Sequence, residues 1–341
     1  MPARLARLRS GVVKNHIEWM PWRWAVLLHA PCQTKVRVVE LTVAVETADG
    51  RTLEVLTSGP DDGLPLLFHW GTPQGAVPFG ILERPAAARK LRVVSYSRPG
   101  YGGSSPRRNG AAATVADDAA DAAVVLDHLG LHDFVTLGWS GGGPRAIACA
   151  ALLPGRCLAA ASGAGVAPSG VHELDFLAGM GPENIEEFEA AMAGAEALED
   201  WLRRNGPSTF AVTADDVIAS FGQLLSEVDK AALTGELAER VAESLRRAGL
   251  QGIVGWRDDD LTLLRPWGFD LTAIEVPVSV WQGAQDKMVP YAHGGWLAEH
   301  IPGARAHLYD NEGHISLIMQ MDRILDDLLD RAGLAGQTGS S

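Results

Sequence analysis

Three runs of mainly apolar residues, at positions 64–70, 91–96 and 133–139, alternate with segments of helical character. A strand that is apolar at nearly every position must be covered on both faces, which is typical of a parallel sheet between two layers of helices. One of the intervening helices is predicted to begin at Thr114 and Asp117, which have the spacing of a capping box. The chain is therefore predicted to be an α/β protein with a mostly parallel sheet flanked by helices.

Further strands are predicted on either side of these three. Residues 36–45 and 51–57 are rich in β-branched and apolar side chains, and the Asp-Gly pair between them favours a hairpin turn. Strands are also predicted at 157–166, 277–282 and 306–309, and helices are expected after the last two.

Residues 170–265 interrupt this alternation, because they contain no convincing strand. Helical stretches are predicted instead at 183–204, 213–228 and 230–248. The segment carries 19 Asp/Glu against 8 Lys/Arg, a balance of −11. We predict a core made of residues 36–169 and 266–332, with 170–265 as a helical insertion. A separate helical domain is the alternative, and it is weaker because the strands after the insertion are too few to form a sheet alone.

The two ends of the chain differ in composition from the rest. Residues 1–40 carry seven Lys/Arg against two Asp/Glu, together with three tryptophans. We predict that residues 1–35 form a poorly ordered extension, although a basic arm with tryptophans could also rest weakly on an anionic membrane surface. The tail 333–341 is small and polar, and we predict that it is disordered.

Composition narrows the possible partners and locations. The net charge of −13 argues against binding nucleic acid, which needs a basic surface. No run of 18 apolar residues is present, so no transmembrane segment is predicted. Three cysteines without C-x-x-C spacing indicate neither a disulfide framework nor a cysteine zinc site. No metal is expected, and a cytoplasmic location is predicted because a reducing compartment fits the cysteines best.

The strongest chemical motif is Gly138-Trp139-Ser140-Gly141-Gly142, which lies between a predicted strand and a predicted helix. In G-x-S-x-G a sharp turn exposes the serine as a nucleophile, and the flanking positions must be small to avoid collisions. The N-terminus of the next helix also favours negative charge nearby. A glycine-rich surface turn is the competing interpretation, but the strand before and the helix after favour the nucleophile.

A serine nucleophile needs a base, and the base needs a carboxylate that orients it. Asp286 follows the predicted strand 277–282, and His314 lies in a loop before the last predicted helix. We predict them as the acid and the base for Ser140, in the chain order that this motif has. Asp310 and the run 258–260 are rival acids, and we expect both to be ordinary surface or helix-cap carboxylates.

An oxyanion needs backbone donors, and the sequence offers two. The amide of Gly141 directly follows the nucleophile, and the amide of Thr72 lies in the loop after strand 64–70. Trp70 and Trp139 flank these positions and are candidates to line a substrate pocket, with ordinary packing equally compatible. His69 is predicted to be structural rather than catalytic.

Taken together, these motifs resemble the α/β-hydrolase superfamily. The resemblance rests on His-Trp-Gly-Thr-Pro at 69–73, Ser-Arg-Pro-Gly-Tyr-Gly-Gly-Ser at 97–104, and Ser140, Asp286 and His314 in that order. It covers about residues 36–329. It implies an eight-stranded sheet and a helical cap after the sixth strand, which 170–265 would supply.

The same resemblance separates branches of the superfamily. Dehalogenase and epoxide-hydrolase branches use an aspartate nucleophile, whereas position 140 is serine. A prolyl aminopeptidase branch has a different elbow and uses cap glutamates for the substrate amine. The glutamates here are predicted to face solvent as part of a helical charge run; they are Glu183, Glu186, Glu187 and Glu189.

The sequence therefore predicts a cofactor-independent serine hydrolase acting on an ester, lactone or related acyl bond of a small molecule. Its acidic insertion is expected to favour neutral acyl substrates over carboxylates. Relatives with the same triad but another acceptor or bond remain alternatives, namely a perhydrolase, C–C hydrolase, acyltransferase or peptidase. A non-catalytic ligand sensor on the same scaffold is the alternative from another class.

Overall fold

The computed structural model describes residues 41–108 and 112–335. The prediction for residues 1–35 lies outside these ranges, as do residues 36–40 of the first predicted strand and residues 336–341 of the predicted tail 333–341. No helix within them is both long and apolar enough to cross a membrane.

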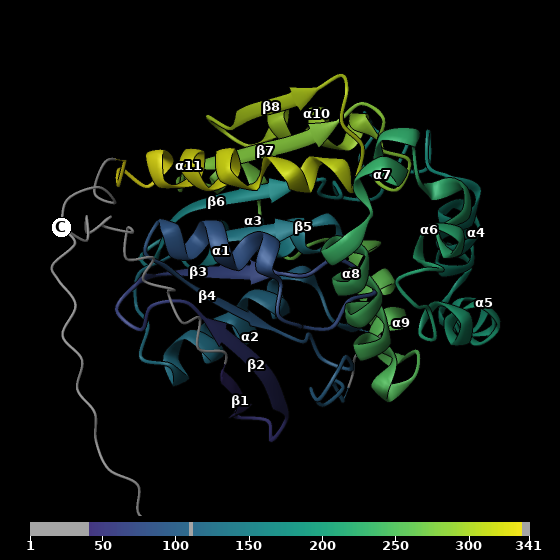
Figure 1. The fold of residues 1–341 in the computed structure, drawn as a ribbon, viewed down its shortest axis with the longest axis horizontal. Coiled ribbons are helices and arrows are strands. Elements are labelled where there is room, and N and C mark those ends of the chain that lie inside the picture. The colour runs from purple at the N-terminus through teal and green to yellow at the C-terminus, as the bar shows by residue number, and fades with distance from the viewer. Residues whose placement is uncertain (1–40, 109–111, 336–341) are drawn as a thin grey trace, which may run out of the picture. The chain divides into compact units, whose positions relative to one another are not determined.

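An eight-stranded sheet forms the centre of the described chain, as predicted (Figure 1). Its strands lie in the order β1-β2-β4-β3-β5-β6-β7-β8, and only the β1–β2 and β2–β4 pairs are antiparallel. The sheet is therefore mostly parallel. The strands are β1 (Leu41–Glu46), β2 (Thr52–Ser58), β3 (Leu64–His69), β4 (Leu91–Tyr96), β5 (Phe134–Trp139), β6 (Cys157–Gly163), β7 (Val278–Gly283) and β8 (Arg305–Tyr309).

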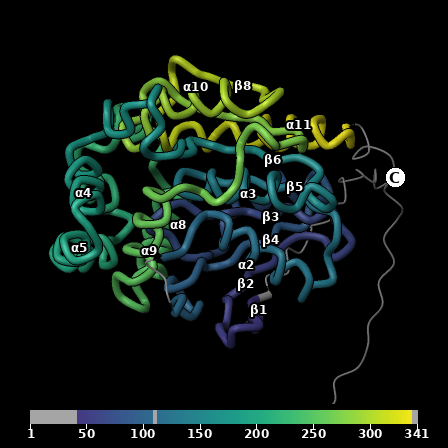
Figure 2. Tube along the Cα trace, turned by 180° about the vertical axis from the view of Figure 1, so that it is seen from behind, coloured from purple at the N-terminus to yellow at the C-terminus, as the bar shows by residue number. Residues whose placement is uncertain are grey.

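Helices cover both faces of this sheet, which explains why β3, β4 and β5 are apolar at nearly every position. Helices α1 (Gly80–Ala88) and α11 (Met321–Arg331) lie on one face. The other face carries α2 (Val115–His128), α3 (Gly143–Leu152) and α10 (Tyr291–His300), as the view from behind shows (Figure 2).

The predicted capping box begins α2. The backbone amide of Thr114 donates to Asp117 Oδ2 at 2.7 Å, so an N-terminal amide that the helix cannot satisfy itself gains a partner. Val115, Ala119 and Leu126, which recur at helical spacing on one face of α2, are buried.

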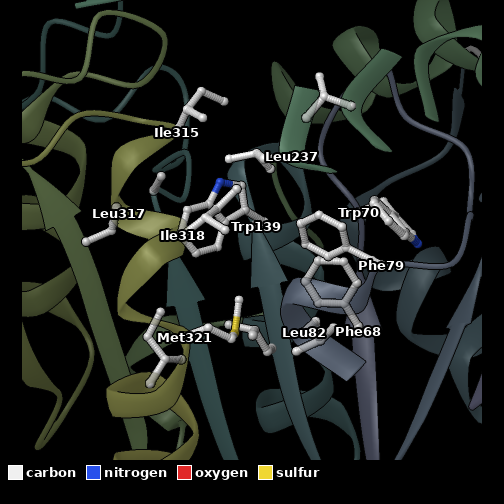
Figure 3. Packing of buried hydrophobic residues seen from close by; sticks show 14 of the residues in the cluster. Phe68, Trp70, Phe79, Leu82, Trp139, Leu237, Ile315, Leu317, Ile318 and Met321 are labelled. Atoms are coloured by element: carbon white, nitrogen blue, oxygen red, sulfur yellow. The ribbon is translucent and has the colours of Figure 1, made fainter. Parts of the chain in front are cut away.

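The two faces of the sheet carry two separate apolar clusters. One joins α2, α3 and α10 to the sheet. The other joins α1 and α11 to it and continues under the insertion, where Phe68, Trp70 and Phe79 pack near Trp139 (Figure 3). The rings of Phe68 and Trp70 meet edge to face with centroids 5.1 Å apart. This second cluster brings apolar side chains up to the edge of the sheet where the candidate site lies.

Between β6 and β7 the chain forms helices and no strand, as predicted from the sequence. The helices lie at the side of the sheet to which the parallel strands point (Figure 1). Within this segment, which spans residues 164–277, we call residues 170–265 the helical insertion. Its helices are α4 (Pro182–Ala193), α5 (Ala195–Thr209), α6 (Val217–Ser220), α7 (Glu227–Ala232), α8 (Gly235–Ala248) and α9 (Val254–Leu263).

Two helical stretches of the insertion are more broken than expected. The predicted helix over 183–204 is divided by Gly194, whose φ of +120° is incompatible with a helix. The stretch 213–228 contains only one short helix before Gly222, where φ is +53°. Ser226 and Asp229 then form a new capping box that starts α7. Glycine conformation and local capping thus outweigh the apolar spacing in this region.

Candidate active site

The topology collects the predicted site residues at one edge of the sheet. Strands β3, β5, β6, β7 and β8 are neighbours and run parallel. Thr72 follows β3, Ser140 follows β5, Asp286 follows β7 and His314 follows β8. Because parallel strands end at the same edge, residues up to 242 positions apart come together there.

Ser140 occupies a strained turn between β5 and α3. Its φ is +54°, a conformation that costs a non-glycine residue about 1–3 kcal/mol. A side chain at Gly138 would overlap the carbonyl oxygen of Gly142, and a side chain at Gly142 would overlap that of His69. Both glycines are therefore required by the turn, for the steric reason that the motif suggested.

His314 and Asp286 form a buried hydrogen-bonded pair. The Nδ1 atom of His314 lies 2.8 Å from Asp286 Oδ2. The other carboxylate oxygen accepts from the backbone amides of Met288 and Val289, each at 2.8 Å. Gln282 Nε2 donates to Oδ2 at 3.0 Å, so the carboxylate is fixed by four donors.

The surroundings of His314 act on its pKa in opposite directions. Burial favours the neutral ring, whereas the charge and hydrogen bond of Asp286 favour the protonated one. The net effect raises the pKa of His314 above its usual value of 6.5.

A carboxylate of the insertion holds the loop that carries His314. Asp229 on α7 accepts from the backbone amides of His314 at 3.2 Å, Ile315 at 2.7 Å and Ser316 at 2.9 Å. Asp229 is fully buried. Asp229 was not predicted as a site residue, although its capping-box spacing from Ser226 is visible in the sequence.

Two cavities meet at Ser140. The larger, of about 200 Å³, has Ser140, Gly141 and Thr72 in one wall and residues of the insertion in the other. The smaller, of about 70 Å³, is lined by Ser140 and His314. Trp70 and Trp139, the predicted pocket-lining residues, are also in the wall of the smaller cavity. Ser140 is thus accessible from a larger chamber with some polar side chains in its wall and from a smaller, mainly apolar one.

The predicted oxyanion donors lie on adjoining turns. A side chain at Gly141 would approach the Thr72 amide nitrogen to 3.4 Å and overlap its hydroxyl oxygen. The Gly71 carbonyl, which shares a peptide group with the Thr72 amide, accepts from Arg98 Nη2 at 2.8 Å. This hydrogen bond fixes the plane of that peptide and polarises its N–H.

Arg98 is one of two buried arginines below these turns. The second is Arg145 on α3, whose Nη1 donates to the Gly141 carbonyl at 2.6 Å and whose Nε donates to Asp118 at 2.7 Å. Neither arginine was predicted as a site residue, although Arg98 belongs to the motif at 97–104.

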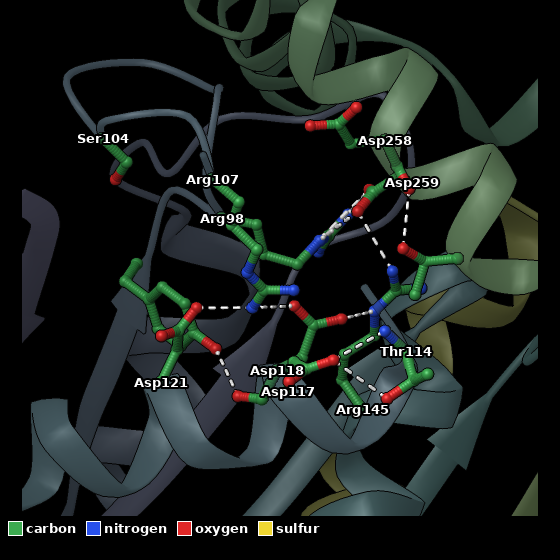
Figure 4. Close-up of polar contacts among 12 residues, drawn as sticks. Arg98, Ser104, Arg107, Thr114, Asp117, Asp118, Asp121, Arg145, Asp258 and Asp259 are labelled. Carbon is green, nitrogen blue, oxygen red and sulfur yellow. Dashed lines mark hydrogen bonds and ion pairs between the residues drawn. The ribbon is translucent and has the colours of Figure 1, made fainter. Parts of the chain in front are cut away.

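Asp259 joins both arginines to the insertion, which corrects the prediction of a solvated or capping run at 258–260 (Figure 4). Its carboxylate pairs with Arg98, accepts from Arg145 at 3.0 Å and accepts from the Thr72 hydroxyl at 2.7 Å. Burial alone would raise the pKa of Asp259, but the two arginines lower it to about 2. Asp258 and Asp260 are buried as well.

The physical reason for this error is the position of α9. Trp256, Leu261 and Leu263 of the same helix are also buried, so α9 is covered on several sides and its carboxylates are enclosed by the protein. Glu187 on α4 is likewise buried against α9, and only Glu186 and Glu189 of the predicted solvent-facing glutamates are exposed.

Two other candidates lie outside the site. Asp310, a rival acid, is exposed at the end of β8. His69 lines neither cavity, and burial together with the nearby Arg98 and Arg145 lowers its pKa to about 3. A histidine that stays neutral and faces no cavity is in keeping with a structural role.

Comparison with known proteins assigns the fold to a family. The model of the alpha/beta hydrolase fold matches residues 65–319, three quarters of the chain. This chain belongs to the α/β-hydrolase family. The predicted resemblance and the predicted fold class are therefore confirmed.

Several α/β-hydrolases of known sequence or structure resemble the chain over most of its length. A non-heme chloroperoxidase of Streptomyces lividans is 29% identical over 84% of this chain and 97% of its own. The serine hydrolase BPHL of Homo sapiens is 22% identical over 85% of this chain and 87% of its own. The esterase RhEst1 of Rhodococcus sp. superimposes with a TM-score of 0.62 at 21% identity, covering 86% of this chain and 99% of its own.

An enol-lactonase of Burkholderia xenovorans has a TM-score of 0.60 at 19% identity, covering 86% of this chain and 100% of its own. At these identities the two superpositions bear on the fold alone. The α/β-hydrolases that this chain resembles thus include proteins named for peroxidase, esterase and lactonase activity.

Asp259→Ala in this α/β-hydrolase is expected to destabilise the fold by about 3–5 kcal/mol, because it leaves two buried guanidinium groups without their shared carboxylate. It should also lower kcat roughly tenfold or more, since the turn carrying Thr72 loses its support. Urea unfolding and steady-state kinetics measure the two effects. Asp215→Ala, at an exposed position of the insertion, is the control and should change stability by less than about 0.5 kcal/mol.

If Asp259→Ala lowered the stability no more than Asp215→Ala, Asp259 would not be the carboxylate that stabilises the two buried arginines. The wild-type protein offers a second check. Because the folded pKa of Asp259 lies near 2, below its value of about 3.9 in an unfolded chain, this contribution is present above about pH 4 and is lost as the pH falls toward 2.

Proposed function

We propose that this α/β-hydrolase is a serine hydrolase that cleaves an ester, lactone or related acyl bond of a small molecule. One observation carries the proposal. Ser140, in its strained turn, opens on the same cavity as His314, and His314 is hydrogen-bonded to Asp286. A nucleophile, a base and an orienting carboxylate are the groups that acyl transfer to serine needs.

The proposed roles follow from the hydrogen bonds. Asp286 accepts from Nδ1–H of His314, which leaves the lone pair on Nε2 free to take the proton of the Ser140 hydroxyl. The serine oxygen attacks the substrate carbonyl and forms a tetrahedral oxyanion. The imidazolium then protonates the leaving alcohol oxygen as the acyl–oxygen bond breaks, and Asp286 stabilises the charged ring while it exists.

The amides of Gly141 and Thr72 are proposed to donate to the oxyanion. Two donors that are already oriented stabilise the charge as it develops, without reorganisation during the reaction. Arg98 and Arg145 act as positioning residues, because they hold the carbonyls of Gly71 and Gly141 rather than the substrate. Water, deprotonated by His314, then attacks the acyl-enzyme and releases the acid, so the proposed cycle uses no cofactor.

Peracid formation is a second candidate. Its support is that the names of similar proteins include non-heme chloroperoxidase and non-heme haloperoxidase. In this reaction hydrogen peroxide replaces water as the attacking group, so the acyl-enzyme yields a peroxy acid and regenerates Ser140. Incubation with acetate and hydrogen peroxide, with the peroxy acid measured directly, separates this outcome from hydrolysis alone.

A fluorophosphonate probe for active-site serines tests the proposal most directly. Wild-type protein should be labelled at Ser140 and should hydrolyse short p-nitrophenyl esters, whereas Ser140→Ala should do neither. Folding of the variant is checked by its melting curve. Absence of both labelling and ester or lactone hydrolysis in the folded wild-type protein would instead indicate a ligand sensor on the hydrolase scaffold.

A further inference from the structure

A pair of carboxyl groups stands in the wall of the larger cavity. Glu187 comes from α4 and Asp260 from α9, and only 8% and 1% of these residues are exposed. Helix α4 packs against α9, so the two carboxyl groups stand near each other in the wall of one cavity. The mechanism proposed above uses neither of them.

The partners of this pair do not balance its charge. Glu187 Oε1 accepts from the indole N–H of Trp256 at 2.6 Å. In the described part of the chain, no N–H or hydroxyl group donates to either oxygen of Asp260. Burial raises the pKa of both carboxyls, and their proximity further raises that of Asp260. Such a pair must hold a proton between its oxygens or accept a cation.

The rest of the larger cavity is suited to a cation. Glu183 is a third acid in its wall, and no described residue that lines it is lysine, arginine or histidine. Trp201 and Trp256, whose rings meet edge to face with centroids 5.9 Å apart, line the same wall. Aromatic faces beside carboxylates are the surroundings that favour an ammonium group.

The two cavities differ in what they can accept from a substrate. The leaving alcohol takes its proton from the histidine, so it must lie on the side of Ser140 that His314 lines, which is the smaller cavity. The acyl part is then directed into the larger cavity, toward Glu187 and Asp260.

We propose that the larger cavity binds a protonated amino group on the acyl part of the substrate, between the carboxyl groups of Glu187 and Asp260. This inference rests on the proposed acyl-transfer function and names the substrate class, namely esters of amino acids in which the amine is free. One N–H of the ammonium group replaces the proton that the two carboxyls otherwise share.

Three benzyl esters of matched length test the inference, namely those of 3-aminopropanoate, butanoate and succinate with its second carboxyl free. The kcat/KM for the amino ester should exceed that for the butanoate roughly ten- to a hundredfold, as expected for hydrogen bonds to a charged group. The succinate ester should be the poorest substrate. The 2-aminoethyl ester of butanoate, with the amine on the alcohol part, should gain no such advantage.

Glu187→Gln is the informative variant, because an amide of similar volume can still donate to Asp260 and preserve the local packing. The ratio of kcat/KM between the amino ester and the butanoate should fall at least tenfold, mainly through KM. Glu189→Gln, the same change at an exposed position of α4, is the matched control and should keep the wild-type ratio. Melting curves establish that both variants fold.

The outcomes separate the two proposals. Hydrolysis of the butanoate without any preference for the amino ester would overturn the ammonium site and leave the serine hydrolase intact. No turnover of any ester would contradict the hydrolase proposal itself. If Glu187→Gln and Glu189→Gln changed the substrate ratio equally, the effect would come from overall charge, and the assignment to this carboxyl pair would be wrong.

Discussion

Ser140→Ala and His314→Ala should each lower kcat by about 10⁴–10⁶-fold, because each removes a group without which the acyl-enzyme cannot form. The double variant should be little slower than either single one, since the two groups act as one unit. Steady-state kinetics on a short-chain ester measure these values. Neither change should unfold the protein. Ser140→Ala removes only one hydroxyl group and leaves the packing around the turn unchanged.

The assignment of the base would be wrong if His314→Ala kept a tenth of the wild-type activity. An independent check comes from pH. The pKa of His314 is raised above 6.5. The ring should therefore become protonated as the pH is lowered through this raised pKa, and kcat/KM should fall in the same range. A profile that stayed flat from neutral pH down to pH 5 would contradict His314 as the base.

Asp286→Asn should lower kcat by roughly 10³–10⁴-fold near neutral pH while the fold is preserved. The amides of Met288 and Val289 require an acceptor at the Oδ1 position, so the new NH₂ group must take the place of Oδ2. There it faces His314 Nδ1, which must then accept a hydrogen bond and carry its proton on Nε2. A ring in that tautomer cannot take the proton of Ser140.

Asp310→Asn is the control, since Asp310 is exposed and outside both cavities, and its kcat should stay within several-fold of wild type. Melting curves should show that both variants are folded. Full activity in Asp286→Asn would mean that another carboxylate orients the histidine. The nearest alternative in the fold is Asp229, whose oxygens already accept from the amides of the histidine loop.

Local patterns explain how much of the fold was predictable. Strands β3, β4 and β5 lie where the mainly apolar runs predicted them. A strand that is buried on both faces must be apolar at nearly every position, so its sequence is easily recognised. The turn at Ser140 was also predictable, since steric limits act within five consecutive residues. Asp286 and His314 could be proposed because each follows a recognisable strand, and parallel strands end at a common edge.

The helical insertion shows where local patterns fail. Its sequence predicted helices and an acidic balance. A run of charged residues, however, has the same sequence pattern whether its side chains face solvent or pair with buried groups. Glu187 was predicted to face solvent, and Asp259 and Asp260 to be surface or helix-cap carboxylates, but all three are buried.

The burial of these carboxylates follows from the packing of α9 against the core. This packing pairs Asp259 with Arg98 and Arg145, which are 161 and 114 residues away in the sequence. The packing of α7 likewise places Asp229 on the histidine loop. The α/β architecture and the order of the candidate triad could be deduced from the amino-acid sequence, because both depend on periodicity and on short-range sterics. Which carboxylates of the insertion are buried follows only from the folded arrangement, because burial depends on contacts between segments that no local pattern connects.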